Sequence, residues 1–293
     1  MKGGMPRSTM RNPRDFQAAL RAGPVLASGA ALVMGIVNLT PDSFYDGGRL
    51  PDPDAARDYA LKLAEDGADL LDLGAESSRP GAEPVPPMAE IARLAPVLER
   101  LEECAVPLSV DTCHAATARL ALDLGAAMVN DISALRHDPE MASVVAEYGC
   151  PCVLMHMQGE PRSMQANPRY QNVVDDICRF FEERIAFALD QGIAREQLWL
   201  DPGFGFGKTV AHNLSLVKHL ATFRQFGLPV LIGTSNKSTI GSVLGLEVHD
   251  RLEGTAATVA ASILAGAHCV RVHDVRAMRR VVRMTEAILK ADG

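Results

Sequence analysis

The sequence lacks an apolar stretch long enough to cross a bilayer, which excludes a chain built around membrane-spanning helices. The longest apolar run near the N-terminus, residues 25–37, is interrupted by Ser28, Gly29 and Gly35, whereas about 20 consecutive apolar residues are needed to span the hydrocarbon core. Residues 1–14 lead into charged residues and not into the apolar segment of a signal peptide. Neither a cleaved leader nor a membrane partner is expected.

A surplus of basic charge is also absent. The chain has 29 Lys and Arg residues against 36 Asp and Glu residues, for a net charge of −7. Binding to nucleic acid would require a local basic patch, and the pattern of charges gives no sign of one. The expected partner is therefore a small molecule and not a nucleic acid.

Paired cysteines of the kind that bind zinc or form redox motifs are missing. Of the six cysteines only Cys150 and Cys152 lie close together, and a single residue separates them. That spacing matches neither a CxxC pair nor half of a zinc site. Free cysteines behave as small hydrophobic residues, so we expect reduced, mostly buried thiols and a cytoplasmic location.

What is present is a regular alternation of short apolar segments and longer segments with helical spacing, which predicts a parallel sheet with crossover helices. The predicted strands are residues 32–38, 69–74, 107–111, 127–131, 151–156, 197–201, 229–234 and 267–273. The predicted helices are residues 54–66, 87–104, 115–124, 139–148, 173–191, 210–226, 250–265 and 276–291.

Eight strands and eight helices favour an α/β fold of the closed (β/α)₈ TIM barrel type over an open doubly wound sheet. Several predicted helices are followed by glycine at the position that takes the left-handed conformation, namely Gly67, Gly125, Gly149, Gly192, Gly227 and Gly266. We expect one catalytic domain over residues 25–293, preceded by an Arg-rich N-terminal extension over residues 1–24. Residues 25–37 are expected to form a small hairpin that leads into the first strand.

Every predicted strand ends in polar residues, and in such a barrel the active site is built from these ends. They are Asn38, Asp72 with Glu76, Asp111, Asn130 with Asp131, His156, Asp201, Ser235 with Lys237, and Arg271 with His273. A single Asp after a strand is usually a helix cap, but eight polar ends together predict a shared cavity. Carboxylates and amides suit the edge of a heterocycle, while lysine, arginine and histidine suit an anion.

Three loops stand out. Residues 40–48 and 77–84 are long for their positions and contain Arg, Asp and Phe, which is typical of lids and binding loops. Residues 203–209 resemble a phosphate-binding loop, but Pro202 stands where its first glycine is required. We therefore expect a glycine loop in which Phe204 and Phe206 can stack on an aromatic substrate.

Seven motifs together resemble dihydropteroate synthase, over nearly the whole chain from Met34 to the C-terminus. They are MGIVNLTPDSF from Met34, GAESSRPG from Gly74, SVDT from Ser109, VNDI from Val129, LMHMQG from Leu154, LDPGFGFGK from Leu200 and RVHDV from Arg271. Members of this family join a pterin methyl pyrophosphate to p-aminobenzoate.

The resemblance implies a role for each matching residue. The pterin would be bound by Asp111, Asn130, Met155, Asp201 and Lys237, and the pyrophosphate by Asn38, Arg271 and His273. The p-aminobenzoate would be bound by Phe44, Ser78, Arg79, Pro80, Phe206 and Ser235. A Mg²⁺ cofactor would be coordinated by Asn38 and Asp46, and Asp111, Lys237 and Arg271 would be catalytic.

The same resemblance implies a dissociative reaction, in which pyrophosphate leaves before the arylamine attacks a pterin methyl cation. Two positions depart from the family pattern. Asn236 stands where Arg is usual, which removes a cation near the arylamine site, and Ser78 stands where Thr is common. The family pattern therefore does not fix p-aminobenzoate geometry or sulfonamide affinity for this chain, and the sequence leaves the effect of Asn236 open.

Three other hypotheses remain open from the sequence. The first is a pterin-binding methyltransferase domain, the second a Schiff-base aldolase with Lys237 as nucleophile, and the third a pterin-binding paralogue that has lost catalysis through Asn236. For association, the helix around Gly254 to Ala265 is rich in small and apolar residues, and the family commonly dimerises on its C-terminal helices. A homodimer and packing of this helix on its own barrel are both consistent with that composition.

Overall fold

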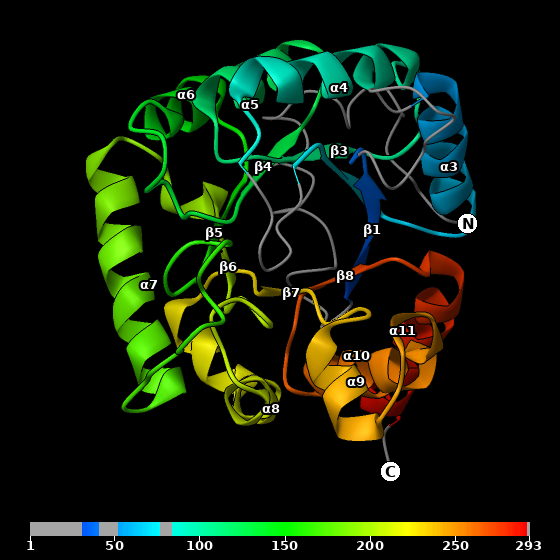
Figure 1. Cartoon of the computed structure of the whole chain (residues 1–293), viewed down its shortest axis with the longest axis vertical. Helices are drawn as coiled ribbons and strands as arrows, with labels where there is room; N and C mark the ends of the chain where they lie inside the picture. The colour runs from blue at the N-terminus through cyan, green and yellow to red at the C-terminus, as the bar shows by residue number, and fades with distance from the viewer. Residues whose placement is uncertain (1–30, 41–51, 77–83, 292–293) are drawn as a thin grey trace.

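The computed structural model describes residues 31–40, 52–76 and 84–291. Within them the strands form one eight-stranded parallel sheet that is surrounded by helices, as Figure 1 shows. The strands are β1 (Leu32–Asn38), β2 (Leu70–Gly74), β3 (Leu108–Asp111), β4 (Met128–Asp131), β5 (Cys152–Met155), β6 (Leu198–Asp201), β7 (Leu231–Ile232) and β8 (Cys269–Val272). The predicted TIM barrel is confirmed.

The helices of the described residues lie outside the sheet. They are α3 (Pro53–Glu65), α4 (Pro87–Arg100), α5 (Ala115–Asp123), α6 (Met141–Tyr148), α7 (Val173–Asp190), α8 (Val210–Lys218), α9 (Ser238–Leu244), α10 (Leu252–Leu264) and α11 (Val275–Leu289), with short 3₁₀ helices between some of them. Helix α9 was not predicted. The single helix predicted over residues 210–226 is also wrong, because α8 gives way to a 3₁₀ helix at Leu220–Phe226.

The sheet runs in the order β6-β5-β4-β3-β2-β1-β8-β7. Between β6 and β7 the described residues show one isolated parallel bridge, which joins Leu200 to Val230, supported by a 2.9 Å hydrogen bond from the Leu200 N–H to the Pro229 carbonyl. This bridge closes the barrel. We call it the β6–β7 seam.

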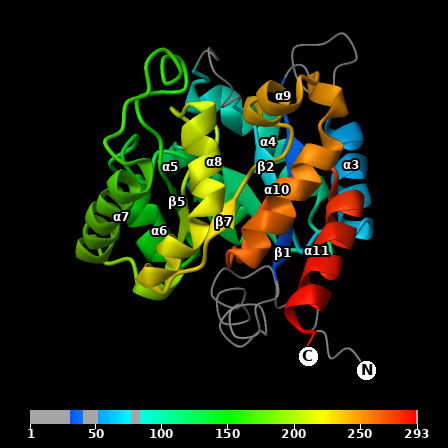
Figure 2. The same ribbon diagram turned by 90° about the horizontal axis from the view of Figure 1, so that it is seen from below.

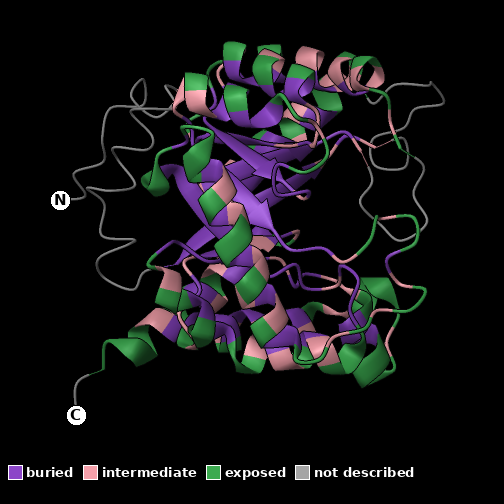
Figure 3. Ribbon diagram, turned by 90° about the vertical axis from the view of Figure 1, so that its left-hand side faces the viewer, coloured by how far each residue is buried: buried purple, intermediate pink, exposed green. Residues whose placement is uncertain are grey.

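Apolar residues fill both sides of the sheet, as Figure 3 shows by its buried strands and the buried inner faces of its helices. A cluster inside the barrel contains Trp199, the only tryptophan of the sequence, with Met34, Leu70 and Val153 among its neighbours. A larger cluster fills the space between strands and helices. The apolar floor leaves the C-terminal ends of the strands as the place for polar side chains.

The chain turns back toward the sheet at the glycines expected from the sequence. All six of these glycines have positive φ, from 64° at Gly227 to 104° at Gly67, a conformation that costs other L-residues free energy. The six cysteines are free thiols, and four of them are buried. None of the helices in the described part of the chain is long and apolar enough to cross a membrane.

Several expectations fall on other parts of the chain. The N-terminal extension over residues 1–24, the first half of the predicted hairpin, and most of the two predicted lid loops lie outside the described residues. The part of the hairpin that is described, Leu32–Asn38, is a strand whose two neighbours β2 and β8 are both parallel to it.

Candidate active site

The C-terminal ends of the strands surround a cavity of about 640 Å³. Its lining includes every predicted site residue that the structure describes: Asn38, Asp111, Asn130, Met155, Asp201, Phe206, Ser235, Lys237, Arg271 and His273. The other predicted site residues, Phe44, Asp46, Ser78, Arg79 and Pro80, lie outside the described residues. Strands far apart in sequence thus bring their polar ends to one place.

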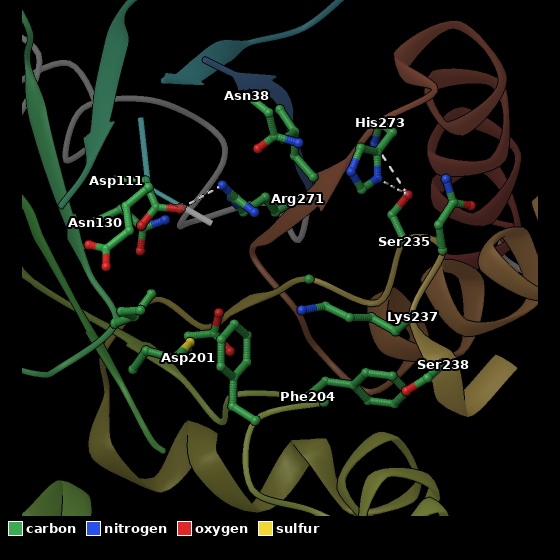
Figure 4. A pocket seen from close by; sticks show the side chains of 18 of the residues that line it. Asn38, Asp111, Asn130, Asp201, Phe204, Ser235, Lys237, Ser238, Arg271 and His273 are labelled. Atoms are coloured by element: carbon green, nitrogen blue, oxygen red, sulfur yellow. Dashed lines mark hydrogen bonds and ion pairs between the residues drawn. The ribbon is translucent and has the colours of Figure 1, made fainter. Parts of the chain in front are cut away.

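An arginine between two carboxylates forms the centre of the cavity. Arg271 of β8 donates from Nε to Asp72 Oδ2 at 2.6 Å and from its terminal nitrogen NH2 to Asp111 Oδ2 at 2.8 Å. Figure 4 shows Arg271 extending from β8 toward Asp111. The Asp72 side chain is fully buried, and those of Arg271 and Asp111 are 18% and 15% exposed. One guanidinium therefore faces two carboxylates in a largely dry environment.

This arrangement changes the protonation of Asp111. Burial raises the pKa of Asp111 to about 7, although Arg271 acts in the opposite direction and Asp72 adds to the increase. A single cation cannot neutralise two neighbouring carboxylates, so the second negative charge is costly to bury. Asp111 can therefore either donate or accept a proton near neutral pH.

Asp201 and Asn130 complete the carboxyl and amide wall. Asp201 Oδ1 accepts the Gly203 N–H at 2.7 Å, and burial raises the pKa of Asp201 to about 6 despite that hydrogen bond and the nearby Lys237. Asn130 donates from Nδ2 to Asp72 Oδ2 at 3.0 Å. The wall offers the alternating donors and acceptors that a nitrogen heterocycle requires.

On the opposite side of the cavity, His273 lies against Ser235. The His273 N–H donates to Ser235 Oγ at 3.2 Å, and the imidazole Nδ1 lies 3.0 Å from the same oxygen. In Figure 4 the Arg271 side chain extends toward Asp111, and His273 and Ser235 lie on its other side, away from Asn130 and Asp201. Asn38, Arg271 and His273 all line the cavity, and their amide, guanidinium and imidazole groups are of kinds that can bind an anion.

Lys237 reaches into the cavity above an aromatic ring. Its Nζ lies 4.2 Å from the centroid of Phe206, which is typical of a cation–π contact. Phe206 packs with Met155, Met157 and Met164 in an apolar cluster. Phe206, Met155 and Met164 also line the cavity, so this cluster gives it an apolar wall.

Asn236, the position that departs from the family pattern, lies in the left-handed region with φ of 57°. Asparagine adopts this conformation more readily than most residues. The Asn236 carbonyl accepts a hydrogen bond of 2.9 Å from Arg251, which itself lines the cavity. A cation is therefore present beside position 236, although another part of the sequence supplies it.

Thr40, the first residue of the predicted binding loop 40–48, lines the cavity. Arg251, Met164 and Val248 also line it and were not predicted. None of these three directly follows a strand, whereas the predicted site was built from strand ends. Arg251 could have been suspected only from its place just before α10, where a long side chain can turn back toward the barrel.

Three polar strand ends do not line the cavity, and the expectation that they would is wrong. Asp72 lies beneath the cavity and holds Arg271 and Asn130. Asp131 accepts the N–H groups of Ser133 and Leu135 at 2.7 and 2.8 Å, so it fixes a turn. His156 faces the buried Lys208.

One of the two expected magnesium ligands lies in the described part of the chain. In the described ranges there is no group of three or more His, Cys, Asp or Glu side chains that could hold a metal ion. Asn38, one of the two expected ligands, lines the cavity. Magnesium commonly uses one or two protein ligands together with substrate phosphates and water. Asn38 as one protein ligand is therefore consistent with magnesium.

The sequence profile described as "Pterin binding enzyme" matches residues 34–273. This range includes β2 to β8, all of β1 except its first two residues, and every residue of the cavity described above. The chain therefore belongs to the pterin-binding enzyme family.

Within that family the chain is similar to dihydropteroate synthases. It is 44% identical to the dihydropteroate synthase of Bacillus subtilis over 263 residues, which is 89% of this chain and 90% of the relative. It is 42% identical to the Yersinia pestis enzyme solved with a sulfonamide drug, with a TM-score of 0.86 over 91% of this chain and 96% of that one. The Xanthomonas albilineans enzyme solved with 7,8-dihydropteroate is 42% identical, with a TM-score of 0.81 over 90% and 95% of the two chains. The family predicted from the motifs is confirmed.

We expect Asp111→Asn to change how stability depends on pH. In the folded protein Asp111 stays protonated up to about pH 7, whereas in the unfolded chain it ionises near its ordinary pKa of about 3.9. The folded state then binds more protons between these values, so the stability from Asp111 is complete below about pH 4 and is lost as the pH rises to about 7. The Asp111→Asn variant does not lose stability in this way, because its side chain does not ionise.

Urea denaturation of both proteins from pH 4 to 7 measures the effect. The unfolding free energy of the wild type minus that of the variant should fall by about 1–3 kcal/mol across this range. Asp190→Asn, which changes an exposed carboxylate of α7, should show no such trend. A difference that grew with pH would mean that Arg271 keeps Asp111 ionised.

Proposed function

We propose that this chain is a dihydropteroate synthase of folate biosynthesis. It joins 6-hydroxymethyl-7,8-dihydropterin pyrophosphate to p-aminobenzoate and releases 7,8-dihydropteroate and pyrophosphate. The observation that carries the proposal is one cavity that brings the carboxyl and amide groups of Asp111, Asn130 and Asp201 together with the side chains of Lys237, Arg271 and His273. The similarity to enzymes of this name supports it.

The pterin ring is assigned to the polar wall. Asp111, Asn130 and Asp201 pair with the donor and acceptor edge of the ring, and Lys237 donates to a ring acceptor. Met155 packs against the ring face. All of these groups line the same cavity, and buried polar groups of this kind discriminate strongly in favour of a ligand that satisfies them.

The pyrophosphate is assigned to Asn38, Arg271 and His273. Arg271 is central, because its planar guanidinium can bind phosphate oxygens while it remains tied to Asp72 through Nε. Mg²⁺, with Asn38 and Asp46 as its protein ligands, would neutralise charge on the pyrophosphate oxygens when bound. The side-chain oxygen of Asn38 suits this ion.

The p-aminobenzoate is assigned to Phe206 and Ser235 together with Phe44, Ser78, Arg79 and Pro80. Phe206 and Ser235 line the same cavity as the pterin-binding residues, and Phe206 lies against Lys237, so the two substrates would meet at Lys237 and Phe206. Arg251, held against the Asn236 carbonyl, adds a positive charge that the sequence pattern did not include. A carboxylate-bearing arylamine suits this charge.

The reaction is a substitution at the methyl carbon of the pterin. The bond from this carbon to the pyrophosphate oxygen breaks, and the electron pair leaves with the pyrophosphate, whose charge Arg271 and His273 stabilise. The positive charge left on the pterin is stabilised by ionised Asp111. The arylamine nitrogen then forms the new bond and loses its proton to the released pyrophosphate, while exclusion of water from the site protects the cation.

The decisive experiment measures pyrophosphate release from the pterin substrate, with and without p-aminobenzoate and Mg²⁺. We expect release to require the pterin substrate and Mg²⁺, and 7,8-dihydropteroate to appear only when p-aminobenzoate is added. An absence of release under every condition would reject the proposal. A borohydride-trapped substrate adduct on Lys237 would support the aldolase hypothesis in its place.

Arg271→Ala should distinguish binding of the pyrophosphate from binding of the pterin ring. Because the guanidinium contacts the anion, its loss should weaken binding of the pyrophosphate substrate by about 2–3 kcal/mol more than that of the bare pterin. Isothermal titration calorimetry with the two ligands measures the difference. Arg276→Ala, an exposed position of α11, is the matched control. Equal losses for the two ligands would remove Arg271 from the anion site.

We further propose a cytoplasmic homodimer built on the C-terminal helices. Helices α10 and α11 lie side by side on one flank of the barrel, as Figure 2 shows. Their exposed apolar residues include Leu264, Met284 and Ile288, which are 53–63% exposed. The six free thiols suit a reducing compartment.

Sedimentation velocity tests the dimer. The wild type should sediment as a dimer, and Met284→Glu with Ile288→Glu should shift it toward the monomer, because charges at an apolar interface are costly to bury. Met88→Glu changes an exposed methionine of α4 and should have no effect. A monomeric wild type at tens of micromolar would contradict this assembly.

A further inference from the structure

A lysine lies buried beneath the glycine loop that joins β6 to α8. Lys208 is only 3% exposed, and among the described residues it is not one of those that line the cavity. It belongs to the segment that resembles a phosphate-binding loop, yet its hydrogen bonds go to His156, Gly203 and Phe206 and not to the residues assigned to the pyrophosphate. The proposed reaction gives it no task.

The ammonium group of Lys208 is surrounded by acceptors. Nζ donates to the carbonyl oxygens of Gly203 and Phe206, both at 2.9 Å, and lies 3.3 Å from the His156 carbonyl. The fourth contact is His156 Nδ1 at 3.0 Å. Burial and the nearby Lys208 lower the pKa of His156 to about 2, so its imidazole is neutral and can accept this hydrogen bond.

These contacts join the glycine loop to the end of β5. Gly203 has φ of 69°, and a Cβ added to it would lie 1.9 Å from the His156 carbonyl oxygen, so the two backbones touch. Buried carbonyl oxygens are costly to leave without a donor, and Lys208 Nζ donates to carbonyl oxygens of both segments, His156 on one side and Gly203 and Phe206 on the other. The Gly203 carbonyl also accepts the Phe206 N–H at 3.0 Å, so Lys208 adds a second donor there.

The same loop sets the position of two residues of the polar wall. The Gly203 N–H donates to Asp201, and the Phe206 ring lies below Lys237 Nζ. At Gly205, an added Cβ would lie 3.1 Å from Lys237 Cδ. The backbone of the loop therefore supports the Lys237 side chain along its length.

We infer that Lys208 is a positioning residue for the ring-binding half of the site. By binding the carbonyls of Gly203 and Phe206, it holds the loop in the shape that orients Asp201 and Lys237, without touching a substrate. The identity of the ring rests on the proposed function, whereas the ordering of the loop does not.

The charged neighbours of Lys208 are few. Burial has the largest effect and lowers the pKa of Lys208 to about 7. Asp201 of β6 acts to raise this pKa, and Lys237, which precedes α9, acts to lower it. A neutral amine still has two N–H groups to donate. The positioning role therefore persists on both sides of neutral pH.

Lys208→Met tests this role, because it keeps the length of the side chain and removes the donor. Amide hydrogen exchange followed by mass spectrometry should show faster exchange in residues 203–207 of the variant. Calorimetry should show binding of bare 6-hydroxymethyl-7,8-dihydropterin weakened about 10- to 100-fold, and binding of inorganic pyrophosphate unchanged. Lys218→Met, an exposed lysine on α8, is the control and should behave as the wild type.

Lys208→Gln keeps an N–H donor and should restore part of the exchange protection and of pterin affinity. If circular dichroism shows that the methionine variant does not fold, the same measurements are made on Lys208→Gln alone. Unchanged exchange in residues 203–207, or equal weakening of pterin and pyrophosphate, would overturn the inference. A wild-type protein that bound no pterin would reject the proposed function, and the exchange data would still decide the role of Lys208.

Discussion

The site depends on one guanidinium that is shared by two buried carboxylates. Arg271 holds Asp72 through Nε and Asp111 through a terminal nitrogen, and Asp72 in turn orients Asn130. Breaking such a buried network by removing one partner is costly, because it leaves an uncompensated charge. The network therefore fixes the positions of Arg271, which suits an anion, and of Asp111 and Asn130, which suit a ring. It also leaves this part of the barrel short of one positive charge, which a cationic intermediate would provide.

Much of the fold could be predicted from the sequence, for an identifiable reason. Strands buried on both faces are short continuous apolar runs, and six of the helices between them are followed by glycines with positive φ, so the alternation is visible without a structure. Helix α9 escaped notice because it is seven residues long and contains Gly241. It is stabilised by tertiary packing, since Arg251 lies directly against Gly241, and no local pattern records such a contact.

The candidate site was predictable to the extent that it is built from strand ends. Asp111, Asn130 and Asp201 line the cavity because parallel strands finish at one face of the barrel. The same argument failed for His156, because the end of a strand does not say which neighbour the side chain will meet. Arg251 could not be found this way at all, since it reaches the cavity from the start of α10 by the length of its own side chain. Lys208 shows a related limit, because an ammonium placed like that of a phosphate-binding loop binds backbone carbonyls here.

The β6–β7 seam links ligand binding to the stability of the barrel. The barrel is held there by one bridge, from Leu200 to Val230, and the polar wall continues across it from Asp201 on one side to Lys237 on the other. A ring bound to both residues would act as a cross-link between the two edges of the sheet. Part of its binding free energy would then oppose opening of the barrel, so ligand binding and barrel closure would be thermodynamically coupled.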